Sequence, residues 1–263
     1  MYIIKIGGGK EINIKGIISD LSTLNEKFII VHGANALRDE LAQRMNYQKK
    51  IVTSISGYDS VFSTEETIDL MMMAYAGLRN KRIVELCQQN NINAVGLSGL
   101  DGKVIQGKRN TGIKVRENGK TLLLRDFSGK PKSINTSLLN LLLENGYTPV
   151  LSVPIIDENN FAINSENDDI VALLQNEMKA EKNISLIEAP GFLLDKNDQN
   201  SLIKKISKDE LTLMEEKVEG RMKRKILALR KLFENGDTTV IISDGRTEHP
   251  IIDALNGNGT IIF

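Results

Sequence analysis

A lysine near the end of a short β-branched run is followed closely by residues that have no side chain. Lys5 lies in the run 2–6, and Gly7 and Gly8 are the first two of three consecutive glycines. Glycines let backbone N–H groups come close to an anion and a lysine adds positive charge, so the segment predicts a cradle for phosphate. Its spacing matches neither the Walker A loop nor the dinucleotide fingerprint. A glycine-rich turn after a strand can also be only a turn.

The second apolar run leads into a similar turn. Residues 28–31 are followed by Gly33, Ala34 and Asn35, which introduce a predicted helix over 36–45. Strand-to-helix turns of one parallel sheet meet at the carboxyl ends of its strands, where open α/β sheets bind ligands. The two turns together favour an anion site.

An acidic segment and a basic segment each precede a predicted helix. The acidic turn 162–169 contains Asn164 and Asp168, and the basic run 220–225 contains Lys225. An aspartate at a helix N-terminus is commonly a cap, which accounts for at least one of the acids. Cations are disfavoured at that end of a helix, so the basic run indicates either a nearby anion or a solvated basic face.

Cysteine and histidine are too scarce for several other chemistries. Cys87 is the single cysteine, and His32 and His249 are the two histidines. One cysteine can form neither an internal disulfide nor a thiolate metal cluster, and we predict no metal site formed by the protein alone. Cys87 lies in a helical pattern and is interpreted as a half-buried apolar residue.

Short β-branched runs alternate with helical stretches along the chain. We predict strands at 2–6, 28–31, 94–97, 148–153, 184–187 and 239–242, and helices at 64–89, 135–145, 168–179 and 220–233. This order predicts an α/β fold with a mostly parallel open sheet between two layers of helices.

One segment interrupts the alternation. Between 103 and 126 three short pieces have the pattern of antiparallel strands around the turn dipeptide Asn118-Gly119, and predict a β-hairpin flap that projects from the sheet. We place a domain boundary near 161–166. This gives a substrate-binding lobe over 1–165, with the flap at about 101–132, and a nucleotide-binding lobe over 166–263.

Composition excludes classes that depend on overall charge or apolarity. The 263 residues include 34 lysines and arginines and 34 aspartates and glutamates. A neutral chain does not predict binding to nucleic acid or to a membrane surface. No stretch approaches the roughly 20 apolar residues that a membrane span needs, and the N-terminus lacks a secretory pattern, so we expect a cytoplasmic protein.

Six motifs in a fixed order carry a family resemblance. These are KIGGG, VHG, VGLSGLDGK, LLENGYTPVLS, INSEND and GRMKRK. Across essentially the whole chain they resemble the amino acid kinase family and, within it, the acetylglutamate kinase branch. The third and last motifs are most similar to the kinases of that branch that act on aminoadipate or glutamate linked to a small amino-group carrier protein. The resemblance implies ATP and Mg²⁺, a carboxylate acceptor and a homodimer.

The resemblance implies a role for each residue that matches a motif. Lys5 and Lys225 would stabilise the transferring phosphoryl group, Asp168 would hold both ammonium groups, and Gly8 would donate an N–H to phosphoryl oxygens. The implied phosphate and substrate positions are Gly7, Gly8, Gly33, Ala34, Asn35, Val61 and Asn164, and the implied nucleotide positions are Pro190, Gly191 and Met222. An acceptor carboxylate with a pKa of about 4.3 is already ionised at neutral pH and needs no general base, which agrees with the absence of a Ser/His or Cys/His arrangement.

Val61 departs from the family pattern. The resemblance places an arginine there that binds the substrate α-carboxylate, and valine has no group that could do so. Either another cation replaces it or the acceptor lacks that carboxylate. An acetylglutamate kinase, a member with altered substrate and a ligand-sensing protein all stay open.

Two surface features bear on partners. Between 101 and 132 there are nine lysines and arginines against three aspartates and glutamates, a positive segment that would attract an acidic carrier or could be a solvated flap. The helix 64–89 is apolar on more than one face, which favours pairing of two subunits.

Overall fold

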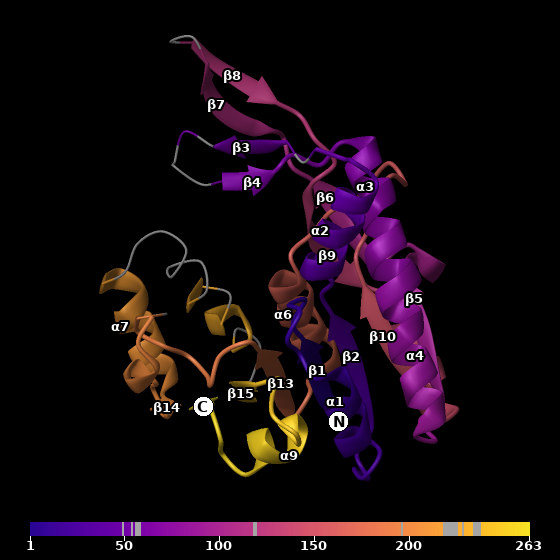
Figure 1. Cartoon of the computed structure of the whole chain (residues 1–263), viewed down its shortest axis with the longest axis vertical. Coiled ribbons are helices and arrows are strands. Elements are labelled where there is room, and N and C mark those ends of the chain that lie inside the picture. The colour runs from indigo at the N-terminus through magenta and orange to yellow at the C-terminus, as the bar shows by residue number, and fades with distance from the viewer. Residues whose placement is uncertain are drawn as a thin grey trace.

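The computed structural model describes the chain except for residues 49, 54, 56–58, 118–119, 196, 218–225, 228 and 234–237. An eight-stranded sheet forms its centre, in the order β14-β16-β15-β13-β1-β2-β10-β5 (Figure 1). β1 (Tyr2–Ile6) lies between β2 (Phe28–His32) and β13 (Lys182–Ile187) and is parallel to both. The other strands are β5 (Ala94–Ser98), β10 (Thr148–Ser152), β14 (Lys205–Ile206), β15 (Thr239–Asp244) and β16 (Thr260–Ile262). β16 is antiparallel to β15.

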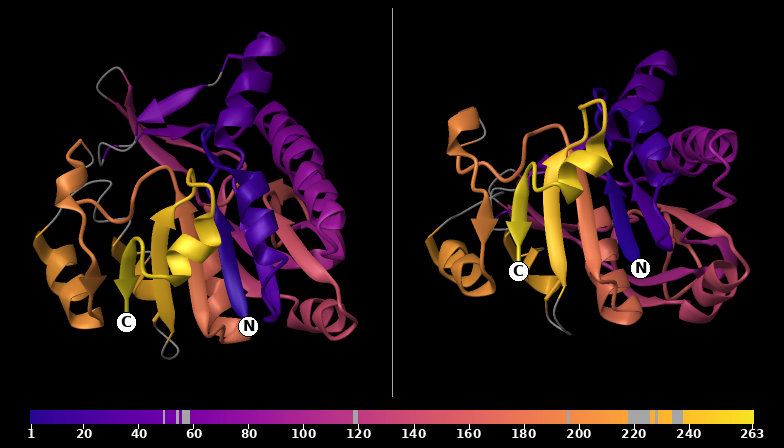
Figure 2. Two further views of the ribbon diagram at one scale, coloured as in Figure 1. Left: turned by 60° about the horizontal axis from the view of Figure 1, so that its bottom comes forward. Right: turned by 90° about the horizontal axis from the view of Figure 1, so that it is seen from below.

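Side chains that alternate along β1 enter two separate apolar layers. Ile3 is buried in one layer, and Ile4 and Ile6 are buried in the other. The layer of Ile4 lies under α1 (Ile14–Leu21), α4 (Asn80–Gln89) and α9 (Pro250–Leu255), whereas the layer of Ile3 lies under α5 (Thr136–Glu144) and α6 (Asn167–Met178). Figure 2 shows these helices on both faces of the sheet. The predicted α/β sandwich is confirmed.

The predicted long helix is one continuous helical segment. It consists of α3 (Glu65–Met71), the π-helix η1 (Met72–Arg79) and α4, and it starts at Thr64, whose side chain accepts the N–H of Thr67. Cys87 lies on its inner side and is fully buried rather than half-buried. Short π-helical stretches are rare and often lie at functional sites.

The flap differs from the predicted three strands. β7 (Ile113–Glu117) and β8 (Lys120–Leu124) form the expected hairpin, around a turn that lies outside the described residues. β6 (Ile105–Arg109) is instead part of a separate sheet with β9 (Gly129–Ile134), β11 (Ile155–Ile156) and β12 (Ala162–Ile163). Ile105 and Gly107 are buried there, so β6 packs in the core of the protein instead of projecting.

A second hairpin accompanies the first. β3 (Ile51–Thr53) and β4 (Asp59–Val61) are antiparallel, and the N–H of Ile55 donates to the carbonyl of Lys114 on β7 at 2.8 Å. Figure 1 shows both hairpins side by side at one end of the molecule. We call β3–β4 and β7–β8 together the double-hairpin flap.

The remaining elements connect and extend these layers. They are α2 (Asn35–Arg44), α7 (Lys208–Lys217), and the short helices η2 (Asp101–Lys103) and η3 (Gln199–Ser201). Within the predicted helix 220–233, residues 226, 227 and 229–231 are helical, and 218–225 lie outside the described residues.

Candidate functional site

Lys5 and Asp168 meet at the carboxyl end of the central strand. Lys5 is on the same face of β1 as Ile3, the face that α6 covers, and Asp168 is in the first turn of α6. The Lys5 ammonium donates to Asp168 Oδ1 in an ion pair. The structure therefore brings together two of the three predicted catalytic residues.

The turns after β1 and β2 touch each other at two glycines. A Cβ on Gly8 would lie 2.7 Å from the amide nitrogen of Asn35, and one on Gly33 would lie 2.8 Å from that of Gly8. The carbonyl of Gly8 also accepts the N–H of Ala36 at 2.9 Å. Only residues without a side chain allow the two turns to come this close. The turn at Gly8 therefore lies in space beside the first residues of α2.

Of the three consecutive glycines, Gly8 is the one suited to an anion. The amide of Gly7 donates to the carbonyl of Leu186, and the Glu188 carboxylate fills the space above Gly9. The Gly8 N–H meets no acceptor among the described residues. Because it lies at the N-terminus of α2, the helix dipole adds to its attraction for negative charge.

The start of α2 is held by a contact that the sequence did not reveal. Ala34 is the N-cap residue and provides no side-chain cap, and its methyl group is buried in the apolar layer. The Asn35 side chain accepts a hydrogen bond from the Tyr75 hydroxyl of η1. Tyr75 thus fixes Asn35 from the opposite side of the turn.

Asn164 lies where the four-stranded sheet meets the start of α6. Its side chain donates to Ser63 Oγ at 3.3 Å, and its backbone bonds to Phe127 and Gly129. Asn167 donates to the carbonyl of His32 at 3.2 Å and so joins the start of α6 to the end of β2. Ile163 and Ile170, which flank this segment, are both buried in the apolar layer of Ile3, so the segment with Asn164 and Asp168 lies on that side of the sheet.

The acids of α6 are paired rather than used as caps, contrary to the sequence-based expectation. The N-cap residue is Glu166, which has no side-chain cap hydrogen bond. Asp168 pairs with Lys5, and Asp169 pairs with Lys231 at 2.7 Å. Tertiary ion pairs thus outweigh local capping here.

The predicted nucleotide positions follow β13. Pro190 and Gly191 lie in the turn after the strand, and a Cβ on Gly191 would approach Leu202 and Thr260 within 3.0 Å. Glu188 precedes them and accepts the N–H of Glu11 at 2.6 Å. The turns after β1 and β13 are therefore joined through Glu188, a contact that the sequence did not predict.

The side chains of three predicted site residues are not among those that the structure describes. Lys225 and Met222 lie outside the described residues, and for Val61 the backbone pairs with Ile51 but the side chain is not among those described. Lys231, from the helical residues that follow the basic run, contacts Asp169 beside Asp168.

Neither His32 nor Cys87 can serve as a base or nucleophile here. The pKa of His32 is lowered to about 3, mainly by burial and to a smaller extent by the charge of Arg79. Its ring accepts a hydrogen bond from Asn80, which identifies it as a neutral structural residue. Burial raises the pKa of the Cys87 thiol to about 12.

A two-glycine anion turn with a lysine–aspartate pair, on a mostly parallel sheet, matches a known family. The model of the amino acid kinase family matches residues 1–244, and the chain belongs to this family.

Relatives are similar over their full length. The chain is 37% identical over 268 aligned positions to the LysW-aminoadipate kinase of Thermus thermophilus, with 100% of both chains covered. It is also 37% identical to the LysW-aminoadipate kinase of Deinococcus radiodurans, covering 100% of this chain and 91% of that protein. The LysW-aminoadipate/LysW-glutamate kinase of Saccharolobus solfataricus is 29% identical, with 100% and 99% covered.

Solved structures share the fold. Carbamate kinase from Giardia has a TM-score of 0.69 at 15% identity, covering 100% of this chain and 98% of that one. An isopentenyl phosphate kinase has a TM-score of 0.63 at 18% identity, with 100% of both chains covered. In the described part of the chain no helix has the length and apolarity to cross a membrane, and no three metal-binding side chains are grouped.

Proposed function

We propose that this protein transfers the γ-phosphoryl group of ATP to the side-chain carboxylate of an N-acylated acidic amino acid. The acceptor is aminoadipate or glutamate linked to an amino-group carrier protein of the LysW type, as in lysine or arginine biosynthesis. The observation that carries this proposal is the Lys5–Asp168 ion pair beside the Gly8 turn. The names of the full-length relatives support the acceptor.

The proposed phosphoryl transfer requires stabilisation of negative charge and no general base. The acceptor carboxylate is ionised at neutral pH, and the transferring group spreads negative charge over its oxygens. Lys5 and the Gly8 N–H are positioned to stabilise that charge, and Asp168 keeps the Lys5 ammonium in place. Asp168 and Asp169 are each paired with a lysine, which fits Mg²⁺ that would arrive on the phosphates of ATP instead of being held by these two acids. That ion would neutralise part of the phosphate charge.

Residues named by resemblance complete the proposed site. Lys225 would be the second lysine at the phosphoryl group, and Met222, Pro190 and Gly191 would border the nucleotide. Asn164 would bind the amino acid part of the acceptor together with the turn 33–35. We assign residues 1–165 to the acceptor and 166–263 to the nucleotide, although the sheet is continuous between β1 and β13 across that boundary.

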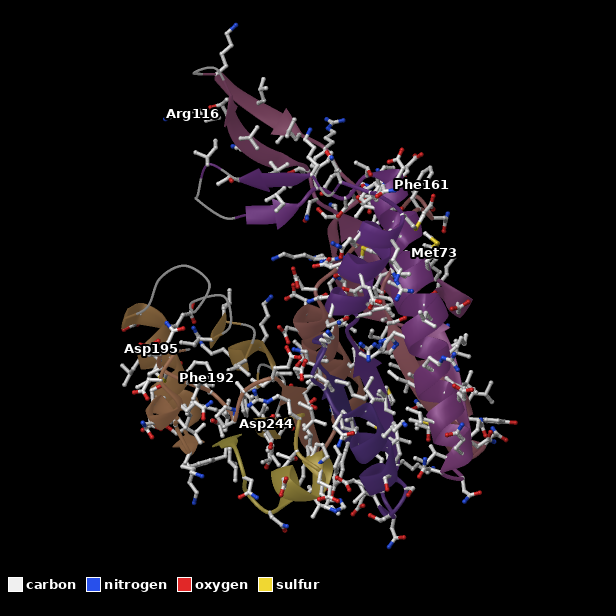
Figure 3. All side chains as sticks on the ribbon, viewed as in Figure 1. Met73, Arg116, Phe161, Phe192, Asp195 and Asp244 are labelled. Carbon is white, nitrogen blue, oxygen red and sulfur yellow. The ribbon has the colours of Figure 1, made fainter. Side chains whose placement is uncertain are left out.

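The double-hairpin flap is the proposed contact for the acidic carrier. Lys114, Arg116 and Lys120 are exposed on β7–β8, beside the exposed apolar side chains Leu122 and Leu123. Figure 3 shows Arg116 on β7 of this flap. Positive charge next to apolar surface suits a small acidic protein.

We further propose a homodimer that works in the cytoplasm, where ATP is available. Met73 and Leu78 of η1 are exposed, 43% and 42% respectively, on a helix that already packs on the sheet (Figure 3). A second copy would cover these side chains. Sedimentation would test this, and a monomer at micromolar concentration would contradict it.

ADP release tests the acceptor and the flap together. We expect turnover with carrier-linked aminoadipate or glutamate to exceed that with free acetylglutamate. Arg116→Glu should weaken the carrier-linked reaction at low salt, whereas Lys15→Glu, on exposed α1 surface, should not. The proposal of a carrier-linked acceptor would be contradicted if free acetylglutamate alone saturated the enzyme and Arg116→Glu had no effect on turnover.

A further inference from the structure

The acceptor class proposed above has a carboxylate that is not phosphorylated. In aminoadipate and glutamate this is the α-carboxylate, which stays charged throughout the reaction. A site that binds it selectively needs a cation, and an arginine is best suited because its planar fork matches a carboxylate. Val61, where the resemblance places an arginine, has no donor.

Arg38 lies in the first turn of α2, directly after the turn that contains Gly33 and Asn35. It lies on α2 three positions after Asn35, so the two side chains are on the same side of the helix. Only 14% of its side chain is exposed. Its Nε and Nη2 both donate to Asp39 Oδ1, at 3.0 and 2.9 Å, and its other N–H groups have no described acceptor.

Tyr75 of η1 is the residue that relates Arg38 to the site. Burial raises the pKa of the Tyr75 phenol, the charge of Arg38 opposes that rise, and the charges of Glu166 and Asp39 add to it. These charges therefore lie near the hydroxyl that also bonds to Asn35. Because Arg38 follows Asn35 by three positions and Asn35 bonds to Tyr75, Arg38 is on the side of α2 that faces η1.

We infer that Arg38 is the specificity-determining residue that binds the unreacted carboxylate of the acceptor. This inference rests on the proposed function. The phosphorylated carboxylate would lie at Gly8 and Lys5, and the second carboxylate would lie farther along α2, within reach of the Arg38 guanidinium. Asn164 and Asn35 border the space between them.

Arg79 is the competing cation. It ends η1, and its Nε is buried without a hydrogen-bond partner. Its charge acts on His32, however, and His32 is paired in register with Ile6, on the opposite face of the sheet from Lys5. Its charge also interacts with Tyr75, so a variant of each arginine is needed to separate their roles.

A comparison of two acceptors tests this inference. One is the acidic carrier linked to aminoadipate, and the other is the same carrier linked to 5-aminopentanoate, which lacks only the second carboxylate. We expect Arg38→Gln to lower kcat/KM for the first about tenfold or more and to leave the second acceptor and the KM for ATP unchanged. Arg38→Lys should be intermediate because it keeps the charge and loses the fork.

Controls separate this role from a structural one. Arg44→Gln changes an arginine of the same helix that is 70% exposed, and should leave both acceptors unaffected. An equal loss with both acceptors in Arg38→Gln, or loss of the preference in Arg79→Gln instead, would overturn the inference while the proposed function stands. Absence of turnover with either acceptor in the unmodified protein would overturn both.

Discussion

The ammonium of Lys5 and the carboxylate of Asp168, 163 positions apart in the sequence, form an ion pair at the junction of β1 and α6. The Lys5 side chain is mostly buried and that of Asp168 is about half exposed. A cation is fixed here by one carboxylate, beside the Gly8 N–H, which has no acceptor in the described part of the chain. Such a pair is pre-organised to stabilise a phosphoryl group.

Removing either member of the pair should impair catalysis more than folding. We expect Lys5→Met to lower kcat by about 100-fold or more, because it removes charge stabilisation of the transferring group. Asp168→Asn should lower kcat less, and the double variant should lose less than the sum of the two effects because the residues act as one unit. Lys15→Met is the matched control, and a Lys5→Met protein with normal kcat would contradict the role.

Gly8→Ala should disrupt the phosphate turn. Its Cβ would lie 2.7 and 2.8 Å from the amide nitrogens of Asn35 and Ala34, so the backbone must move away from the start of α2. We expect a large loss of kcat and a weaker affinity for ATP, measured by turnover and by calorimetry. Gly77→Ala, where the nearest atom is 3.3 Å away, should retain both. Equal behaviour of the two variants would count against the turn.

The dependence of kcat on pH should show no ionisation of a histidine. Burial holds the pKa of His32 at about 3, so it stays neutral over the accessible range. The acceptor carboxylate needs no base. We therefore expect kcat to be flat between roughly pH 6 and 8, judged against the ordinary histidine pKa of about 6.5. A decline centred near that value would indicate a proton transfer that this account lacks.

Stability should depend on pH through His249 and Asp20. Asp20 is buried and accepts hydrogen bonds from His249 and from the N–H groups of Ile251 and Ile252 at the start of α9. The hydrogen bond to Asp20 raises the pKa of His249. The folded state therefore binds this proton more tightly, and the added stability is complete below about pH 6.5 and lost as pH rises through the folded-state pKa.

Thermal unfolding of two variants checks this dependence. His249→Gln should unfold at a lower temperature than the unmodified protein at pH 5.5, with the difference shrinking toward pH 9. Asp20→Asn should be the less stable variant at every pH, since two amides of α9 lose a charged acceptor. A His249→Gln difference that grows with pH would have the wrong sign.

The sequence pattern predicted most of the strands and helices, but it did not predict which of them contact one another. The strands at Lys5 and Val31 and the turns after them were predicted because a β-branched run ending in glycine has few alternatives. β6 was assigned to the flap wrongly, because a short strand does not specify its partner and Ile105 is buried against another sheet. The cap expected at the start of α6 was also wrong, because Asp168 and Asp169 form ion pairs with lysines that are distant in the sequence.

The site was predicted as a set of positions, without the residues that hold them. Nothing near Asn35 in the sequence indicates Tyr75, and nothing near Gly9 indicates Glu188, because both contacts join segments far apart in the chain. Arg38 likewise has the pattern of a surface helix residue until its low exposure is known.

Trapping of the product tests the central claim most directly. Carrier-linked aminoadipate, ATP, Mg²⁺ and the protein are incubated with hydroxylamine, which converts an acyl phosphate to a hydroxamate. We expect one hydroxamate for each ADP released, and we expect Lys5→Met to lower the formation of both products together by about 100-fold or more. Binding of ATP without ADP release, or ADP release without hydroxamate, would contradict phosphorylation of a carboxylate and favour a ligand-sensing role.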